Sequence, residues 1–281
     1  MMAIERLKLF RVVVSLAVAV AFAAGCSSGP KPMLESSAVL AVRAELSAKE
    51  VLQGSVILLT VRVPASRGLS DLVAKFNVTD LPLYSVTNSV SEDGLIFQSI
   101  IGIPASYKVG SASIKLIYQG EIIPLLFTVL DAKYSSEVLR VDPRHVHPNV
   151  KDAARIKREA AEVGRIYTQV TKDKLWDGPF LLPINSEKTS RFGTKRVYNG
   201  DFQSYHSGLD LKALVGTPVN ASATGVVVLA KELFLTGNTV LINHGYGLFS
   251  LYAHLSKLNV RPSQRVGAGT GLGLSGQTGR V

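Results

Sequence analysis

Residues 39–142 read as a series of short β-strands. Apolar, largely β-branched runs lie at residues 56–63, 95–103, 113–118 and 122–130. Glycine or proline separates one run from the next, and strands with this spacing are typical of a small β-sandwich. The region holds no cluster of His, Cys or carboxylate residues. We therefore expect it to act as a spacer, to cover a cleft or to bind a partner, and not to catalyse a reaction.

A helical pattern follows this region. Apolar residues recur at steps of three and four in residues 151–171, which places them on one face of a helix: Ala153, Ile156, Ala160, Val163, Tyr167 and Val170. Charged and mostly basic residues fill the other faces. This period predicts a helix. From Pro179 onward the chain is rich in Gly and β-branched residues, so residues 143–178 are predicted to be a helical linker to a second β domain at 179–281.

The first 25 residues have the pattern of an export signal. Basic residues precede an apolar run at 12–24, which is shorter than the roughly 20 residues that a membrane-spanning helix needs. The run ends in Ala-Ala-Gly before Cys26, which resembles a bacterial lipobox, so Cys26 is predicted to be lipidated and residues 26–38 to form a polar tether. An ordinary signal peptide with an incidental cysteine is the alternative. Ser27 resembles a signal for sorting to the outer membrane of a Gram-negative host.

The composition narrows the function classes. The chain has 281 residues, of which 47% are hydrophobic, and one Cys, so wholesale disorder and a disulfide scaffold are both excluded. Its formal net charge of +10 favours an anionic partner. In an exported, lipid-anchored protein we expect that partner to be membrane lipid or cell-wall polymer, and not nucleic acid.

The motif His206-x-x-x-Asp210 carries the clearest candidate chemistry. Gly208 disfavours a helix, so the segment is predicted to be extended, and residues four apart then share one face of a strand. His206 and Asp210 would face the same way, with Leu209 and Leu211 pointing into a core. An imidazole and a carboxylate together suit a divalent ion, zinc above all, although a surface hydrogen bond would use the same pair.

Other histidines lie in three places. In residues 248–255, apolar and polar side chains alternate as on the two faces of a strand. One face would carry Phe249, Leu251, Ala253 and Leu255, and the other would carry Ser250, Tyr252 and His254. This strand is predicted to form either a cleft wall or a solvated surface. His145 and His147 form an H-x-H pair without a third ligand nearby in sequence, so we expect linker residues rather than a metal site. His244 is expected at a β-turn.

The C-terminal hundred residues resemble a known family. Ordered matches run through residues 190–193 (SRFG), 199–200 (NG), 206–210 (HSGLD), 216–219 (GTPV), 236–238 (TGN), 244–248 (HGYGL), 252–256 (YAHLS) and 276–280 (GQTGR). Together they are similar to the lysostaphin-type, or LytM-like, zinc endopeptidases of peptidoglycan. The resemblance covers residues 179–281, and the upstream sandwich and basic helix are similar to the accessory region of exported members.

The resemblance implies a fold and a site. The C-terminal domain is expected to be a compact, twisted antiparallel β-sheet with a groove for peptide, which makes the fold class mainly β with one linking α-helix. His206 and Asp210 would be the first two Zn²⁺ ligands, and His254 would be a catalytic residue beside the bound water. Asn199 matches a position that contacts the metal in inactive forms of some relatives. Tyr252 is a candidate groove residue, with core packing as its alternative.

One feature of the family has no match in the sequence. The third ligand of the family is the second histidine of an H-x-H pair a few residues after the Thr-Gly-Arg turn, and the sequence stops at Val281, directly after that turn. A catalytic zinc site ordinarily has three protein ligands and an open position for water. The sequence is therefore expected to be an incomplete, truncated copy that lacks this ligand and binds zinc weakly.

Three functions remain open at this point. The expected one is a zinc-dependent endopeptidase acting on peptidoglycan in the cell envelope, anchored by lipid at Cys26 to the periplasmic face of the outer membrane if the host is Gram-negative. The main alternative is a non-catalytic LytM-like regulator that binds and activates a cell-wall amidase. The presence of His206, Asp210 and His254 favours the enzyme. A lipid-anchored wall-binding module is the third.

Overall fold

The computed structural model describes residues 42–64, 72–86, 94–169, 171–200 and 202–281. These residues divide into two compact units. The first comprises the described residues up to Lys49 with Ile57–Ser99 and Ser113–Phe127, and the second comprises Glu50–Val56, Ile100–Ala112 and Thr128–Val281. Within the described ranges, no helix combines the length and apolar character needed to span a membrane. The predicted export signal, Cys26 and the whole of the predicted tether lie outside the described residues.

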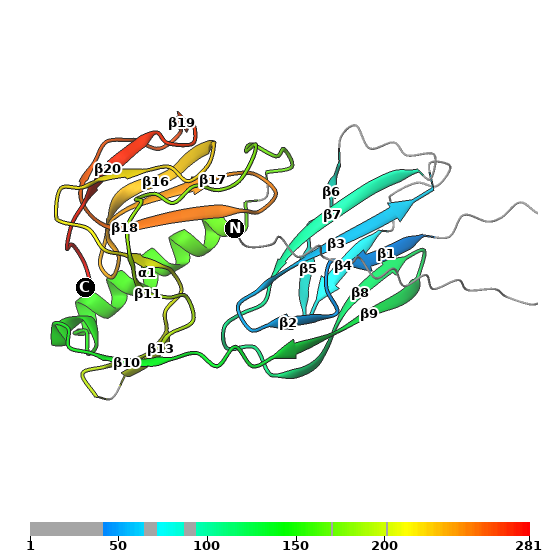
Figure 1. Cartoon of the computed structure of the whole chain (residues 1–281), viewed down its shortest axis with the longest axis horizontal. Coiled ribbons are helices and arrows are strands. Elements are labelled where there is room, and N and C mark those ends of the chain that lie inside the picture. The colour runs from blue at the N-terminus through cyan, green and yellow to red at the C-terminus, as the bar shows by residue number, and fades with distance from the viewer. Residues whose placement is uncertain (1–41, 65–71, 87–93, 170, 201) are drawn as a thin grey trace, which may run out of the picture. The chain divides into compact units, whose positions relative to one another are not determined.

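The N-terminal region is built from strands that alternate buried and exposed residues. One sheet has the strand order β1-β3-β7-β6 and another has the order β2-β9-β8-β4-β5 (Figure 1). The strands are β1 (Arg43–Leu46), β2 (Glu50–Leu52), β3 (Val56–Val63), β4 (Val73–Phe76), β5 (Thr79–Leu81), β6 (Tyr84–Ser85), β7 (Leu95–Gly102), β8 (Gly110–Tyr118) and β9 (Glu121–Leu130). Leu59, Val61, Leu116 and Val129 are fully buried. Each sheet therefore turns one face toward a core, as a β-sandwich requires.

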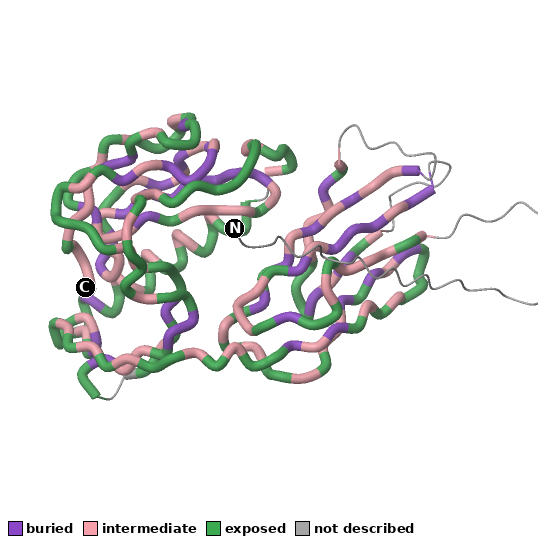
Figure 2. Tube along the Cα trace, viewed as in Figure 1, coloured by how far each residue is buried: buried purple, intermediate pink, exposed green. Residues whose placement is uncertain are grey.

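A curled antiparallel sheet forms the centre of the C-terminal region (Figure 1). Its order is β15-β20-β18-β17-β16-β19, and the strands are β15 (Pro218–Asn220), β16 (Gly225–Leu233), β17 (Gly237–Asn243), β18 (Phe249–Leu258), β19 (Arg265–Val266) and β20 (Gly271–Ser275). Figure 2 shows buried residues running along these strands. Neighbouring residues of β17 enter different clusters, because Val240 and Ile242 join one core and Leu241 joins another. This confirms the predicted antiparallel C-terminal sheet.

Strand β18 differs from the predicted alternation. Tyr252 and Leu255 share one core although three positions separate them, and Leu251 is exposed. The reason is a bulge, since three steps of β18, from Tyr252 to Leu255, lie opposite two steps of β17, from Val240 to Asn238. The predicted separation of Tyr252 from Leu255 is therefore wrong.

Two short ladders are separate from the main sheet. β10 (Ser136–Leu139) pairs in parallel with β12 (Lys195–Tyr198), which pairs in antiparallel with β13 (Phe202–Tyr205). β11 (Lys188–Ser190) pairs in antiparallel with β14 (Asp210–Leu211). The boundary predicted at residue 142 therefore does not separate the sheets, because a strand that precedes it pairs with one that follows it.

Helix α1 (Val150–Tyr167) follows a 3-10 turn (Pro143–His145) and agrees with the predicted helix. The side chain of Asn149 caps its N-terminus. The buried face is displaced from the predicted one: Ala153 and Ala160 are exposed, whereas Val163 packs against a buried leucine cluster of the sheet. The predicted apolar stripe was wrong at the alanines because charged side chains make part of the contact.

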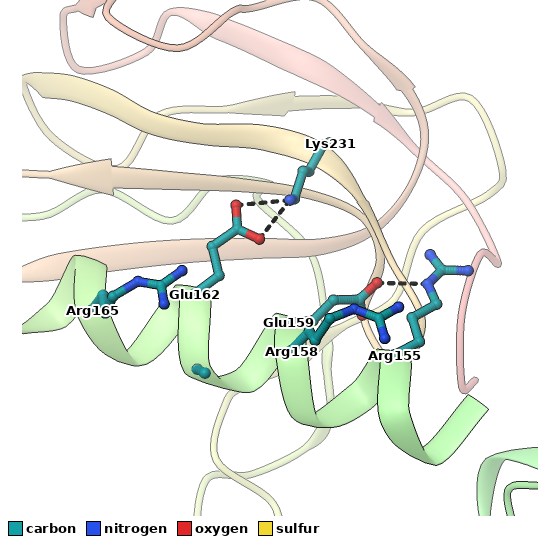
Figure 3. Close-up of a pocket in the computed structure, with 7 residues that line it drawn as sticks. Arg155, Arg158, Glu159, Glu162, Arg165 and Lys231 are labelled. Atoms are coloured by element: carbon teal, nitrogen blue, oxygen red, sulfur yellow. Dashed lines mark hydrogen bonds and ion pairs between the residues drawn. The ribbon is translucent and has the colours of Figure 1, made fainter. Parts of the chain in front are cut away.

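Those charged side chains join α1 to β16. Glu162 accepts hydrogen bonds from Lys231 of β16 at 2.7 Å, whereas the hydrogen bond from Arg155 to Glu159 at 2.6 Å lies within the helix. Glu159 also accepts a hydrogen bond from the backbone amide of Phe234 at 2.7 Å. The side chains of Arg155, Glu159, Glu162 and Lys231 help to line a pocket between the helix and the strand (Figure 3). Its volume is about 560 Å³.

Candidate metal centre

His206 and Asp210 lie at the ends of neighbouring strands rather than within one strand. His206 follows β13, Asp210 begins β14, and the chain bends at Gly208. His206 Nε2 lies 3.0 Å from Asp210 Oδ1. In a straight strand, residues four apart would stand about 13 Å apart. The two side chains therefore converge through a bend, and the predicted continuous extended segment is corrected.

The imidazole of His206 is oriented so that Nε2 can act as a ligand. Its Nδ1 donates a hydrogen bond to the backbone carbonyl of Arg191 at 3.0 Å, which leaves a lone pair on Nε2. This lone pair and a carboxylate oxygen can face each other at 3.0 Å when a cation, either a proton or a metal ion, lies between them. Two ligands of one tetrahedral zinc, with bonds of about 2.0–2.1 Å, stand roughly 3.3 Å apart. The donor types and their spacing therefore fit zinc.

Gly208 leaves space beside this pair. A Cβ atom at Gly208 would lie 3.6 Å from His206 Nε2, which is the atom that would bind the ion. The adjacent Leu209 is 41% exposed, so the prediction that it enters a core is wrong. The bend at Gly208 ends the strand alternation on which that prediction depended.

Asp210 has a second partner in Arg196. The guanidinium Nη2 donates to Asp210 Oδ2 at 2.5 Å. Burial by itself raises the pKa of the Asp210 carboxyl, but the hydrogen bonds and positive charges of His206 and Arg196 outweigh burial and hold that pKa below its ordinary value. Asp210 is therefore ionised at neutral pH, as a metal-binding carboxylate has to be.

Glu137, Ser190 and Arg196 join the two candidate ligands, and none of the three is among the residues predicted for the site. Glu137 Oε1 accepts hydrogen bonds from Arg196 Nε at 2.6 Å and from Ser190 Oγ at 3.1 Å. Ser190 stands in one of the matched motifs, which was a usable signal. Glu137 lies 59 positions before Arg196 in a short strand, and no local pattern distinguishes it.

His254 projects from the bulge in β18. Its backbone φ of 60° lies in the left-handed region, which costs a non-glycine residue about 1–3 kcal/mol. The backbone amide donates to the Thr236 carbonyl at 2.8 Å, and Nδ1 donates to the Thr278 carbonyl at 2.7 Å. Asn238 connects the two turns that hold His254, because its backbone amide donates a hydrogen bond to Thr278 Oγ1 at 2.9 Å. Two of the matched turns thus hold His254 with a lone pair on Nε2.

The electrostatic surroundings of His254 connect it to the same cluster. Burial lowers the pKa of His254 below its ordinary value, more than the Thr278 hydrogen bond and the Asp210 carboxylate raise it, and the charges of Arg280 and Arg196 lower it further. His254 is therefore neutral at pH 7. A neutral imidazole with a free Nε2 can accept a proton.

Asn199 and Tyr252 are engaged elsewhere. The Asn199 amide group exchanges two hydrogen bonds of 3.0 Å with the backbone of Val141. Tyr252 is buried in the core, and its hydroxyl accepts a hydrogen bond from the Ser222 amide at 2.7 Å. Asn199 therefore binds the chain at and just after the end of β10. Tyr252 packs in the core and does not line a groove.

The remaining histidines have structural contacts. The ring of His145 stacks edge-on against Phe234, with centroids 5.1 Å apart. His244 is fully buried, its Nδ1 donates to the Thr224 carbonyl at 2.8 Å, and its Nε2 lies 2.7 Å from Ser250 Oγ. In the part of the chain that the structure describes, no three His, Cys, Asp or Glu side chains are grouped so as to hold a metal ion.

Comparison with known proteins identifies the region around this site. The model of peptidase family M23 matches residues 204–281. The peptidoglycan DD-endopeptidase ShyA of Vibrio cholerae is 46% identical over 88 residues, which are 31% of this chain and 19% of ShyA. The cell division protein DipM of Caulobacter vibrioides is 41% identical over 105 residues, 37% of this chain and 16% of DipM. The matches thus span less than a fifth of these relatives.

A solved structure resembles more of the chain. The crystal structure of a peptidase M23 from Pseudomonas aeruginosa aligns with a TM-score of 0.57 and 27% identity over 81% of this chain and 84% of the other. His206, Asp210 and His254 all lie in the segment that the family model matches. Over residues 204–281, which hold these three residues, the chain is therefore similar to peptidase family M23.

Proposed function

We propose that this chain is a zinc-dependent endopeptidase that hydrolyses peptide bonds of bacterial peptidoglycan. The observation that carries the proposal is the approach of His206 Nε2 to within 3.0 Å of Asp210 Oδ1 inside an M23 domain. The names of the relatives support it, because ShyA is a peptidoglycan DD-endopeptidase and Mpg of Neisseria meningitidis is a DD-carboxypeptidase/endopeptidase.

The residues of the site divide the chemistry among them. A bound zinc ion would polarise the scissile carbonyl and lower the pKa of a bound water. His206, tied to Arg191 through Nδ1, keeps Nε2 available as a ligand, and ionised Asp210 supplies negative charge. Neutral His254 can take up and return a proton at Nε2, a form of catalysis that contributes about 10²–10⁴-fold.

We also propose that the chain acts at the cell envelope, anchored by lipid on Cys26. The net charge of +10 suits surfaces rich in carboxylates and phosphates. Labelled fatty acid should be incorporated into the expressed wild-type chain and not into Cys26→Ser. Equal labelling of both would contradict the anchor without affecting the proposed hydrolysis.

Digestion of purified peptidoglycan tests the activity. In the presence of zinc we expect cleaved cross-links among the released muropeptides, detected by mass spectrometry. His206→Ala and Asp210→Ala should abolish release, because each removes a ligand, and His254→Ala should lower the turnover number by about 10²–10⁴-fold. Catalytic zinc sites ordinarily use three protein ligands, and two are assigned here. Zinc affinity is therefore measured in a separate experiment on two chains, this one and one to which an H-x-H segment is added after Val281.

The controls separate catalysis from regulation. Circular dichroism shows whether each variant keeps its fold. Zinc binding with no muropeptide release from either chain would contradict the endopeptidase proposal. If those same preparations stimulated a cell-wall amidase, the regulator would become the better explanation.

A further inference from the structure

One carboxylate outside the M23 match contacts the groups that hold both candidate ligands. Glu137 lies in β10, and the parallel pairing of β10 with β12 places it opposite Arg196 in register. Both residues precede residue 204, where the family match begins. Their side chains form an ion pair and are largely shielded from solvent, with 15% of Arg196 and 29% of Glu137 exposed.

The first route runs from Glu137 to Asp210. Arg196 Nε donates to Glu137 Oε1 at 2.6 Å, and Arg196 Nη2 donates to Asp210 Oδ2 at 2.5 Å. The planar guanidinium therefore fixes the two carboxylates relative to each other. It occupies Oδ2 of Asp210 and leaves Oδ1, the oxygen that faces His206 Nε2, available.

The second route runs from Glu137 to His206. Ser190 Oγ donates to Glu137 Oε1 at 3.1 Å and lies 3.3 Å from His206 Nδ1. Since the hydroxyl proton goes to the carboxylate, the hydroxyl oxygen can accept from the Nδ1 proton, together with the Arg191 carbonyl at 3.0 Å. Glu137 thus helps to fix the tautomer that leaves Nε2 as a ligand.

The charges make the arrangement interdependent. A guanidinium beside a metal ligand repels a divalent cation unless another anion offsets its charge. Glu137 provides that anion, so that the group of Glu137, Arg196 and Asp210 keeps one net negative charge for the cation. Without Glu137, Arg196 would neutralise Asp210.

We propose that Glu137 is a positioning residue of the zinc site, acting on Asp210 through Arg196 and on His206 through Ser190. Strand β10 is then part of the metal centre, although it lies outside the M23 domain and before helix α1. The inference rests on the proposed zinc site, and it adds that the affinity of that site depends on a segment upstream of the domain.

Zinc affinity of the full chain tests the inference. Competition with a chromogenic chelator measures the dissociation constant, and the visible absorption of bound Co²⁺ reports the ligand geometry. Glu137→Gln should weaken zinc binding by about 10- to 100-fold, as loss of outer-shell partners does, and should alter the Co²⁺ spectrum. Arg196→Lys should do the same, because an ammonium group cannot bridge the two carboxylates as a guanidinium does.

Glu187→Gln is the matched control. Glu187 pairs with Lys212 at 3.3 Å, and both side chains are 70% exposed. The substitution removes the same charge beside the β11–β14 ladder without touching His206 or Asp210. We expect its zinc affinity and Co²⁺ spectrum to equal those of the wild type. Unfolding of the metal-free variants shows which are folded, and Arg196→Lys carries the test if Glu137→Gln is not.

The outcomes separate this inference from the proposed function. Weaker binding in Glu137→Gln and Arg196→Lys, but not in Glu187→Gln, supports it. Wild-type affinity in a folded Glu137→Gln or Arg196→Lys, with binding lost in His206→Ala, overturns the inference and leaves the zinc site standing. Equal weakening in Glu187→Gln also overturns it, because net charge alone would explain the loss. A wild-type chain that binds no zinc, both as it stands and with the H-x-H extension, overturns both.

Discussion

The space beside His206 Nε2 depends on the absence of a side chain at Gly208. An alanine methyl group there would lie 3.6 Å from Nε2, in van der Waals contact with the atom that we propose as a zinc ligand. We expect Gly208→Ala to weaken zinc binding severalfold, measured by chelator competition. The unfolding transition should change little, because Gly208 is not held at a positive φ.

Gly267→Ala is the control for this substitution. Its added Cβ would have Thr270 Oγ1, at 3.9 Å, as its nearest neighbour, and its φ is not positive either. Zinc affinity should stay at the wild-type level in this variant. Unchanged affinity in Gly208→Ala would show that the ion does not occupy the space assigned to it.

The residues of the site differ in how far the sequence could predict them. His206, Asp210 and His254 stand in short motifs, so local sequence was enough to select them. Glu137 and Arg196 meet only because two strands pair across 59 positions, and pairing of that kind leaves no mark on the neighbouring residues of either strand.

At the level of elements, the partly buried carboxylate of Glu159 should hold helix α1 to the sheet more strongly than the exposed ion pair of Glu162 with Lys231 does. The side chain of Glu159 is 17% exposed and accepts the backbone amide of Phe234. Glu159→Ala leaves this donor without its partner and should lower the free energy of unfolding by about 1–3 kcal/mol. Glu162→Ala removes a pair with Lys231 whose side chains are 37% and 45% exposed, and should cost about 0–1 kcal/mol.

Urea denaturation of the two variants, followed by circular dichroism, measures both losses. Glu162 provides the matched comparison, because it is the same residue type one turn further along the helix, facing the same strand. An equal loss in the two variants would mean that the amide contact of Glu159 contributes nothing beyond a surface ion pair.

The same elements show where sequence patterns predict structure and where they do not. The period of α1 predicted a helix, but Ala153 and Ala160 are exposed because Glu159 and Glu162 take part in the docking. In β18 the bulge at His254 breaks the two-residue period. Both departures come from tertiary contacts, an ion pair to another strand and a turn against Thr278, which a local period does not encode.

For the whole molecule, the lowered pKa values of two histidines, His244 and His254, should make stability depend on pH. Burial lowers the pKa of His244 below its ordinary value, more than its hydrogen bond to the Thr224 carbonyl raises it, and burial does the same to His254. Below about pH 6.5, the pKa of an unperturbed histidine, the unfolded chain binds protons that the folded chain does not. The free energy of unfolding should therefore fall with decreasing pH, by up to about 1.4 kcal/mol per pH unit for each histidine, until the lowered pKa is reached.

Urea denaturation of the metal-free chain at pH 7.5, 6.5 and 5.5 measures this slope. His244→Gln should reduce the slope, and His244→Gln with His254→Gln should reduce it further, because glutamine does not titrate. The variants are compared by how steeply the free energy of unfolding changes with pH. A loss of stability that is the same at every pH therefore does not affect the comparison. If the double variant kept the wild-type slope between pH 7.5 and 5.5, the pH dependence would belong to other groups, and the neutral state assigned to His254 at the site would lose this support.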